Sequence, residues 1–359
     1  MAADYFMWAS HGFEAARQLR GSGDAARRHG HSFRVEGRRP VAPGELPSAV
    51  DLEAFFTRLQ QTLRPLDYND LNTVMGSVAD DDLVCWMGER LELGVRLHLA
   101  AGPGQGVTRE ADGKIHGWLR DRFEAAHFLP HVPVGHKCGR LHGHGFEVVL
   151  HQPSGVSGMR LLREVWRGLR AQLHGRCLNE LAGLDIPTSE GLAGWIWHQM
   201  QIRGSVLSAV TVYETATCGS TFDGLRYRIW KERSFDSAMR CLTHPDSAIH
   251  GIAGEILQPS TLWGHTYRLR LGLTAPLDAL MGWAMDFGDV KRLFAPIYQQ
   301  LDHHPLHERV PAGTTSALLE WIVTQTLPVL PMLDRVDLYE TPQVGVIWSL
   351  PGGVSGPAA

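Results

Sequence analysis

The sequence predicts an α+β protein built from three tandem units, each with two strands, two helices and two further strands. Three observations predict this fold. Four short markers recur in the same order three times, the copies are about 110–120 residues apart, and the central copy switches between strand and helix periodicity. This spacing suits a small domain and exceeds that of a solenoid repeat. A separate unit would leave the edges of its antiparallel sheet open, so we expect the sheets to join into a barrel-like ring with helices outside.

The four markers divide the chain into consecutive units. The first reads FEAAR, FEAAH and FDSAM, the second contains a shared histidine, the third follows the first helix, and the fourth closes the unit. The markers are located, in that order, at Phe13, Phe123 and Phe235; His31, His144 and His265; Leu66, Leu173 and Leu301; and Val95, Val210 and Val336. We therefore expect units at 1–117, 118–231 and 232–350, followed by a flexible tail of small residues at 351–359.

Each element of the central copy follows from its local pattern. The opening strands alternate or run apolar, and the first helix carries apolar residues at helical spacing. The second helix begins with Thr188 or Ser189 as its cap, and a glutamate follows in the first turn. The expected elements are strands at 122–129 and 142–151, helices at 159–174 and 187–201, and strands at 207–218 and 224–230.

Composition limits the classes of function. The 359 residues are 44% hydrophobic and carry a formal net charge of −4, so no global positive field would attract nucleic acid or an anionic membrane. The N-terminus lacks a basic region followed by an apolar run, and no apolar stretch approaches the length of a membrane span. Five scattered cysteines argue against a disulfide framework, and we expect a cytoplasmic protein.

The central copy contains a candidate metal site. His142 and His144 are two residues apart on an expected strand, so both side chains point to one face. Antiparallel pairing with the preceding strand can bring His127 beside them. Three imidazoles with no fourth protein ligand are the usual arrangement for catalytic zinc. The alternative is that the histidines of an H-x-H pair merely face solvent.

Cys138 lies four residues before His142 and directly after Lys137. A nearby cation would lower the pKa of the thiol and make it a base or nucleophile near neutral pH, so we expect it to be catalytic. The alternative is a small buried hydrophobic side chain. We expect His131 and His136 to be loop residues without a ligand role.

Residues 122–150, together with PTSEGLAGWIW and VYET, resemble the 6-carboxytetrahydropterin synthase branch of the 6-pyruvoyltetrahydropterin synthase family. The resemblance implies the tunnelling fold, in which rings of three units stack in pairs, so three linked units would give a homodimer with the form of a pseudo-hexamer. It also implies zinc on the three histidines and 7,8-dihydroneopterin triphosphate as substrate. The product would be 6-carboxy-5,6,7,8-tetrahydropterin, a precursor of 7-deazaguanine compounds such as queuosine.

The resemblance further implies that the cysteine works with an Asp-His pair after the first helix, and that a glutamate near the end of the unit anchors the pterin. The outer copies have lost much of this set. The first copy keeps two histidines, and the third keeps the Asp-His pair and the glutamate. In the first copy, His29 and His31 are kept, but the first histidine, the cysteine, the histidine of the Asp-His pair and the glutamate are replaced by Arg17, Ala25, Tyr68 and Leu99, respectively. In the third copy, the first two histidines are replaced by Met239 and Trp263, and His265 is kept.

The central copy in turn has His174 and Gly175 where the Asp-His pair should be. These losses are complementary, so we expect one composite site per chain. Copy two would supply the zinc ligands and Cys138, and copy three would supply Asp302 and His303. The alternative is that Asp302 caps a helix and His303 faces solvent.

The pterin ring offers a donor–donor edge that a carboxylate matches with two charge-assisted hydrogen bonds. Glu214 or Glu340 could fill this role, and we favour Glu214 because the motif around it is best preserved. Hydroxyl groups that could help hold the ring belong to Thr188 and Ser189, or to Thr314 and Thr315. Two alternatives to the 6-carboxy synthase remain. One is a lyase that forms the 6-pyruvoyl product or acts on a related dihydropterin, and the other is a non-catalytic homologue that binds pterin or zinc.

Overall fold

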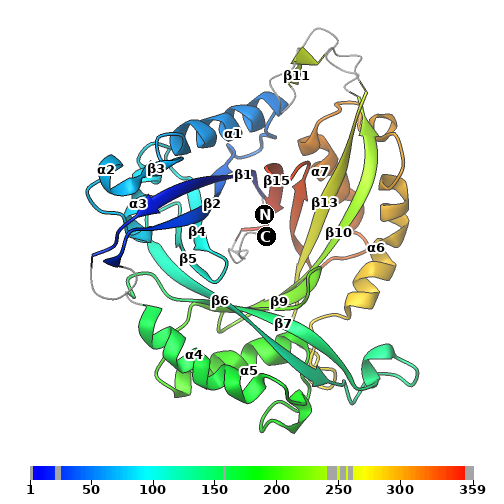
Figure 1. Ribbon diagram of the computed structural model, residues 1–359. Helices are drawn as coiled ribbons and strands as arrows, with labels where there is room; N and C mark the ends of the chain where they lie inside the picture. The colour runs from blue at the N-terminus through cyan, green and yellow to red at the C-terminus, as the bar shows by residue number, and fades with distance from the viewer. Residues whose placement is uncertain are drawn as a thin grey trace.

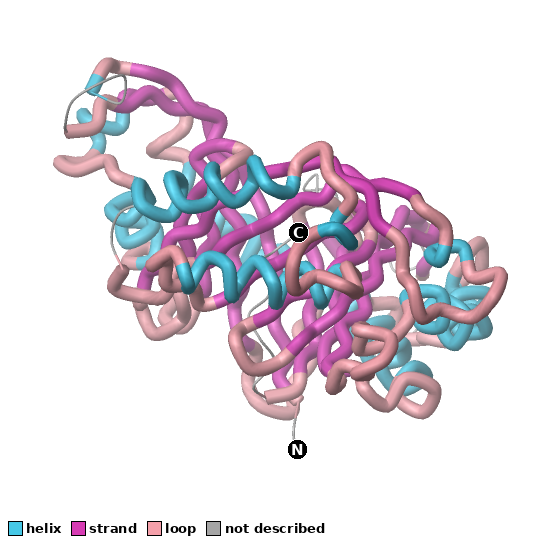
Figure 2. The backbone as a smooth tube through the Cα atoms, turned by 90° about the horizontal axis from the view of Figure 1, so that it is seen from below, coloured by secondary structure: helices cyan, strands magenta, loops and turns pink. Residues whose placement is uncertain are grey.

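The computed structural model describes residues 3–20, 26–156, 159–240, 249–250, 256–257 and 262–351. Ala25, Cys241 and residues 352–359 of the expected tail lie outside these ranges. In the described chain, one large antiparallel sheet closes on itself into a 12-stranded barrel, with seven α-helices on its outside (Figure 1). The view from below shows helices flanking the strands (Figure 2). None of the helices in these ranges combines the length and apolarity needed to span a membrane.

The barrel strands neighbour one another in the order β15, β14, β13, β10, β9, β8, β7, β6, β5, β4, β2, β1. Their bounds are β1 Asp4–Arg17, β2 His29–Pro40, β4 Arg96–Gly102, β5 Gln105–Arg109, β6 Ile115–His127, β7 His142–His151, β8 Ala209–Thr215, β9 Cys218–Phe222, β10 Tyr227–Met239, β13 Trp263–Thr274, β14 Leu333–Tyr339 and β15 Val344–Ser349. Short β3 (Asn69–Asp70) runs parallel to β1, and β11 (Ile249–His250) pairs with β12 (Ile256–Leu257) in a separate hairpin.

Closure of the ring is achieved by the first and last strands. β1 pairs antiparallel with β15 from Asp4↔Ser349 to Ala9↔Val344. This pairing satisfies the backbone groups that an open sheet would expose. The prediction that the sheets join into a ring with helices outside is therefore confirmed as a closed antiparallel barrel.

The helices cover the barrel through their apolar sides. Leu162, Trp166, Leu169 and Leu173 of α4 recur at helical spacing and are buried against the sheet. Of the two candidate caps for α5, Thr188 is the one used, because its side chain accepts a hydrogen bond from the N–H of Gly191. The helix bounds are α1 Ala49–Leu63, α2 Leu71–Val74, α3 Asp80–Gly88, α4 Met159–Leu173, α5 Ser189–Ile202, α6 Phe287–Leu301 and α7 Thr315–Thr326.

The expected elements of the central copy are present, with one correction. The stretch 224–230 does not close that copy, because β10 continues from Tyr227 to Met239 and β9 is the preceding strand. The polar run 231–234 separates the two apolar parts of β10 in the sequence, but it is paired throughout with β13. Tertiary pairing therefore overrides the local pattern. The expected boundaries at 117/118 and 231/232 both fall inside strands.

Candidate metal and pterin site

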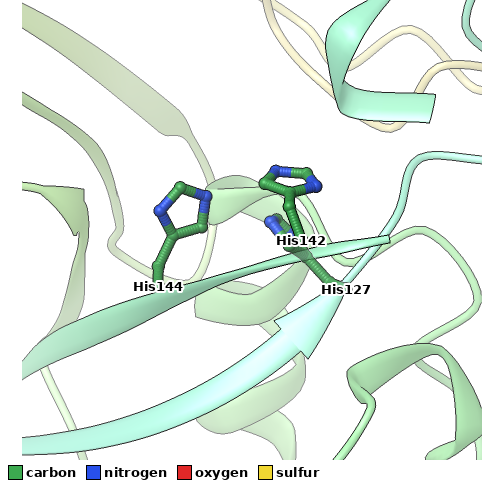
Figure 3. Close-up of side chains that lie close together, drawn as sticks. All are labelled: His127, His142 and His144. Atoms are coloured by element: carbon green, nitrogen blue, oxygen red, sulfur yellow. The ribbon is translucent and has the colours of Figure 1, made fainter. Parts of the chain in front are cut away.

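Three histidines converge on one face of β6 and β7. His127 at the end of β6 pairs directly with His142, and His144 lies two residues further along β7. Their rings lie side by side above the two strands (Figure 3). The ring centroids of His127 and His142 are 4.5 Å apart, and both lie 5.1 Å from that of His144. The nitrogens that could bind a metal lie within 4.8 Å of one another.

The hydrogen bonds of these rings leave nitrogens free for a metal. Nδ1 of His127 donates to the carbonyl of Pro187, and Nδ1 of His142 donates to that of Arg140, each at 2.7 Å. A carbonyl only accepts, so Nε2 of both rings keeps its lone pair. Nε2 of His127 and of His144 is buried without a hydrogen-bond partner among the described residues. Buried nitrogens in this state fit a metal ion well.

Burial also favours the neutral form of two of these histidines. It lowers the pKa of His127 to about 4, aided by repulsion from His142 and His144. Burial, followed by repulsion from His142 and Lys137, lowers the pKa of His144. Since imidazole binds metal in its neutral form, the lowered pKa values of His127 and His144 suit both side chains to Zn²⁺ near neutral pH.

Two of the three histidines, His142 and His144, border a large pocket between two distant segments of the chain. Its volume is about 780 Å³. Cys138, His142, His144 and Glu214 line one side, and the start of α6 lines the other. Four cationic side chains also face it: Lys137, Arg140, Lys231 and Lys291. The pocket therefore joins metal ligands, a thiol and a carboxylate to a cationic wall that suits an anionic ligand.

The pKa of the Cys138 thiol shifts in the direction opposite to the one expected from the sequence. Cys138 lies in the short 3₁₀ helix η2 (Lys137–Gly139). Burial raises the pKa of the Cys138 thiol, the Glu214 carboxylate raises it further, and Lys137 opposes these effects only in part. Lys137 does lower this pKa, but with the protein side chains alone burial and a carboxylate 76 residues away in sequence outweigh it, so the net shift is upward.

Only one of the two candidate pterin anchors lines this pocket. The Glu214 carboxylate has Oε1 3.5 Å from Nε2 of His144. Burial, followed by the charge of Glu190, raises the pKa of Glu214 to about 7. The Glu340 carboxylate is instead held by Nε2 of His265 at 3.0 Å and by the hydroxyl of Thr315.

The hydroxyls of Thr188 and Ser189 lie at the start of α5, next to the loop before α6. Thr188 donates to the carbonyl of Gly282 at 2.7 Å, and Ser189 donates to Glu190 at 2.9 Å. Oε1 of the buried Glu190 accepts from the N–H of Ala284 at 2.9 Å. These groups tie α5 to the third part of the chain, and neither hydroxyl is among the residues that line the pocket.

Asp302 and His303 lie away from the pocket in the same chain. The pocket is lined by the N-terminal end of α6, and the pair follows its C-terminal end, about 22 Å away for a helix of 15 residues. Nδ1 of His303 lies 3.1 Å from Oδ1 of Asp302, and the His303 side chain is 75% exposed. His303 has a positive φ of 58°, and its N–H donates to the carbonyl of Asp236. The structure thus does not bring this pair to Cys138 within one chain.

The corresponding strand pairs of the outer copies have the same register but other side chains. Arg17 pairs with His29 as His127 pairs with His142, and Met239 pairs with Trp263. The Arg17 guanidinium donates to the carbonyl of Val78 and forms an ion pair with Asp80 at 2.6 Å. A fixed positive charge therefore occupies the position of a metal ligand in the first copy.

Three residues of this region were not assigned by sequence reasoning: His136, Glu190 and Asp286. Nε2 of His136, which we expected to have no ligand role, lies 2.9 Å from Oδ2 of Asp286. Glu190 was recognised only as an acidic residue in the first turn of a helix. A signal for Asp286 existed in the motif MDFGDVK, where an aspartate precedes a helix.

Comparison with family models and with known sequences indicates one family. A family model described as 6-pyruvoyl tetrahydropterin synthase matches residues 117–224 and 228–349. The 6-carboxy-5,6,7,8-tetrahydropterin synthase of Synechocystis sp. is 34% identical over 113 residues, covering 28% of this chain and 86% of that protein. The 6-pyruvoyl tetrahydropterin synthase structure from Caenorhabditis elegans is 18% identical, with a TM-score of 0.30, and covers 33% of this chain and 92% of its own. The Plasmodium falciparum structure is 15% identical, with a TM-score of 0.26, and covers 34% and 97%.

Proposed function

The chain belongs to the 6-pyruvoyl tetrahydropterin synthase family, and on this premise we propose that it is a zinc-dependent 6-carboxy-5,6,7,8-tetrahydropterin synthase. Its substrate would be 7,8-dihydroneopterin triphosphate, and its product would supply a pathway to 7-deazaguanine compounds such as queuosine. The observation that carries the proposal is the group of three imidazoles, two of which line one pocket together with Cys138 and Glu214. The similarity to the Synechocystis synthase supports the 6-carboxy product over the 6-pyruvoyl product.

The three histidines would hold the metal, with Nε2 of His127 and of His144 as two of the ligand atoms. When bound there, zinc supplies a Lewis acid that stabilises negative charge on the hydroxyl oxygens of the substrate side chain. His127 and His142 are held in the required tautomer by their bonds to backbone carbonyls.

Glu214 would orient the pterin. An ionised carboxylate accepts two hydrogen bonds from the ring N–H and the amino group. Glu340 is less suited, because His265 and Thr315 already occupy its oxygens. Cys138 would move a proton at the substrate side chain, and Lys231 and Lys291 would attract the triphosphate.

We further propose that the chain consists of three tandem units of the tunnelling fold at 1–117, 118–231 and 232–350. The equivalent register of the β1–β2, β6–β7 and β10–β13 pairs supports this division. The central unit would bind the only zinc, and the outer units would close the barrel. Arg17 in the first unit and Met239 in the third argue against a metal there.

Asp302 and His303 would act from a second chain in a homodimer, since they do not reach the pocket of their own chain. Mixing Cys138→Ala and His303→Ala chains tests this. A hybrid dimer regains one complete site only if the pair acts between chains, so activity should reappear on mixing. Light scattering should give twice the 39.8 kDa of one chain. A monomeric mass, or no recovery on mixing, would contradict the proposal.

Zinc content and product identity test the function directly. We expect one zinc per chain after reconstitution, lost in His142→Ala and retained in His131→Ala, whose side chain lies exposed in the neighbouring loop. Mass spectrometry should then detect the 6-carboxy product, triphosphate and a two-carbon aldehyde. A wild-type protein that binds no zinc, or that forms only the 6-pyruvoyl product, would refute the assignment.

A further inference from the structure

The imidazole of His136 connects the segment that carries Cys138 to helix α6. Its Nδ1 accepts a hydrogen bond from the backbone N–H of Cys138 at 3.2 Å. Its Nε2 lies 2.9 Å from Oδ2 of Asp286, a residue 150 positions further along the chain. Because Nδ1 is an acceptor, the ring proton resides on Nε2 and is donated to the carboxylate.

Asp286 uses both of its carboxylate oxygens. Oδ1 accepts from the N–H of Gly288 at 2.6 Å and so caps α6, while Oδ2 accepts from His136. The cap fixes the carboxylate relative to a helix whose own position is set by its packing on the barrel. Asp286 therefore anchors the imidazole to a rigid element, and it also lines the pocket that His142, His144 and Cys138 border.

Nδ1 of His136 caps the short helix η2, which carries Cys138. His136 is the N-cap of η2, and its capping interaction is the bond to the Cys138 N–H. A single 3₁₀ turn has few internal hydrogen bonds, so its cap contributes a large share of its order. The direction of the thiol is thus coupled to the His136–Asp286 contact.

We propose that His136 and Asp286 form a positioning pair for Cys138. The carboxylate holds the imidazole in the tautomer whose Nδ1 binds the Cys138 backbone, and this bond orients the thiol in the pocket. The pair acts through Cys138 and requires no contact with substrate. It rests on the proposed function only in taking Cys138 as the reacting thiol.

Three variants separate this role from a simple effect of charge. Asp286→Asn keeps the helix cap through its amide oxygen, since asparagine caps as well as aspartate, but the NH2 group that then replaces Oδ2 cannot accept the proton of Nε2. His136→Ala removes the imidazole and leaves the Asp286 charge in place. Asp289→Asn is the matched control, because it makes the same charge change in the same helical turn. Its carboxylate is exposed, pairs with Arg292 and does not line the pocket.

The first measurement is alkylation of zinc-loaded protein by iodoacetamide, with modification of Cys138 followed by mass spectrometry and Cys177 as internal reference. We expect about tenfold faster modification of Cys138 in Asp286→Asn and in His136→Ala, and no further gain in the double variant. Asp289→Asn should match the wild type, and all variants should retain wild-type zinc content. An unchanged rate in His136→Ala, or an equal acceleration in Asp289→Asn, would overturn the proposal.

The second measurement is steady-state turnover of dihydroneopterin triphosphate. We expect kcat to fall about tenfold in Asp286→Asn with KM unchanged, because a misdirected thiol affects the reacting geometry and leaves ground-state binding intact. Wild-type turnover in this variant would contradict the positioning role. If the wild-type protein were inactive on pterin, the proposed function would fail, while the alkylation rates would still decide the role of the pair.

Discussion

Acidification should destabilise this protein through a histidine buried inside the barrel. His151, at the end of β7, is 7% exposed. Burial lowers its pKa to about 3, and the positive charges of His116, Arg96 and Arg120 contribute. In the unfolded chain a histidine has a pKa of about 6.5. At a pH between these two pKa values, His151 binds a proton in the unfolded state and none in the native state.

The free energy of unfolding must therefore fall as the pH is lowered from 6.5 towards 3, by about 1.4 kcal/mol per pH unit for this one residue. Integrated from pH 7 to pH 5, the loss due to His151 is about 2 kcal/mol. Burial holds the pKa of His98 well below its usual value too, so this residue acts in the same direction.

Urea unfolding of the wild type and of His151→Gln at pH 7 and pH 5 measures this effect. Glutamine keeps a polar side chain and does not titrate, so the variant should lose about 2 kcal/mol less than the wild type over this interval. Zinc release and all other titrating groups affect both proteins and cancel in the comparison. If the two pH-dependent losses agree within about 0.5 kcal/mol, the reasoning is refuted.

Two further predictions follow from the strand pairs. Arg17→His restores a three-histidine set with His29 and His31, so metal analysis should find two zinc ions per chain instead of one; a single zinc would show that the loss of Arg17 alone does not create a site. Phe146→Ala should lower the free energy of unfolding by about 3–5 kcal/mol in urea titrations, because this fully buried ring stacks on Phe123. A loss below about 1 kcal/mol would indicate that the core relaxes around the cavity.

Local patterns were sufficient for much of the fold and for the grouping of three histidines. The helix at α4 follows from apolar residues at helical spacing, and the second helix from its capping residues. The grouping of His127, His142 and His144 needed only the alternation of a strand and one antiparallel pairing. All of these depend on residues close in sequence or on neighbouring strands, where backbone geometry decides which side chains meet.

Inference from complementary losses did not locate the Asp-His pair. Asp302 and His303 are retained where the central copy has lost its own pair, but retention does not reveal which end of α6 faces the pocket. The structure places Asp286 and Gly288 there and leaves His303 exposed at the other end. Orientation of a helix against a distant segment follows from the packing of its whole apolar face, which no motif of a few residues encodes.

The sequence by itself thus predicted the closed antiparallel architecture with helices outside, which the structure has, and the grouping of the three candidate zinc ligands. Only the tertiary structure decided the contacts between segments, such as His136 with Asp286 and Glu190 with Ala284. It also decided the sign of the pKa shift at Cys138, where burial and Glu214 outweigh the adjacent Lys137. The physical reason is that periodicity and capping depend on neighbours along the chain, whereas burial and charge environment depend on which distant residues ring closure brings together.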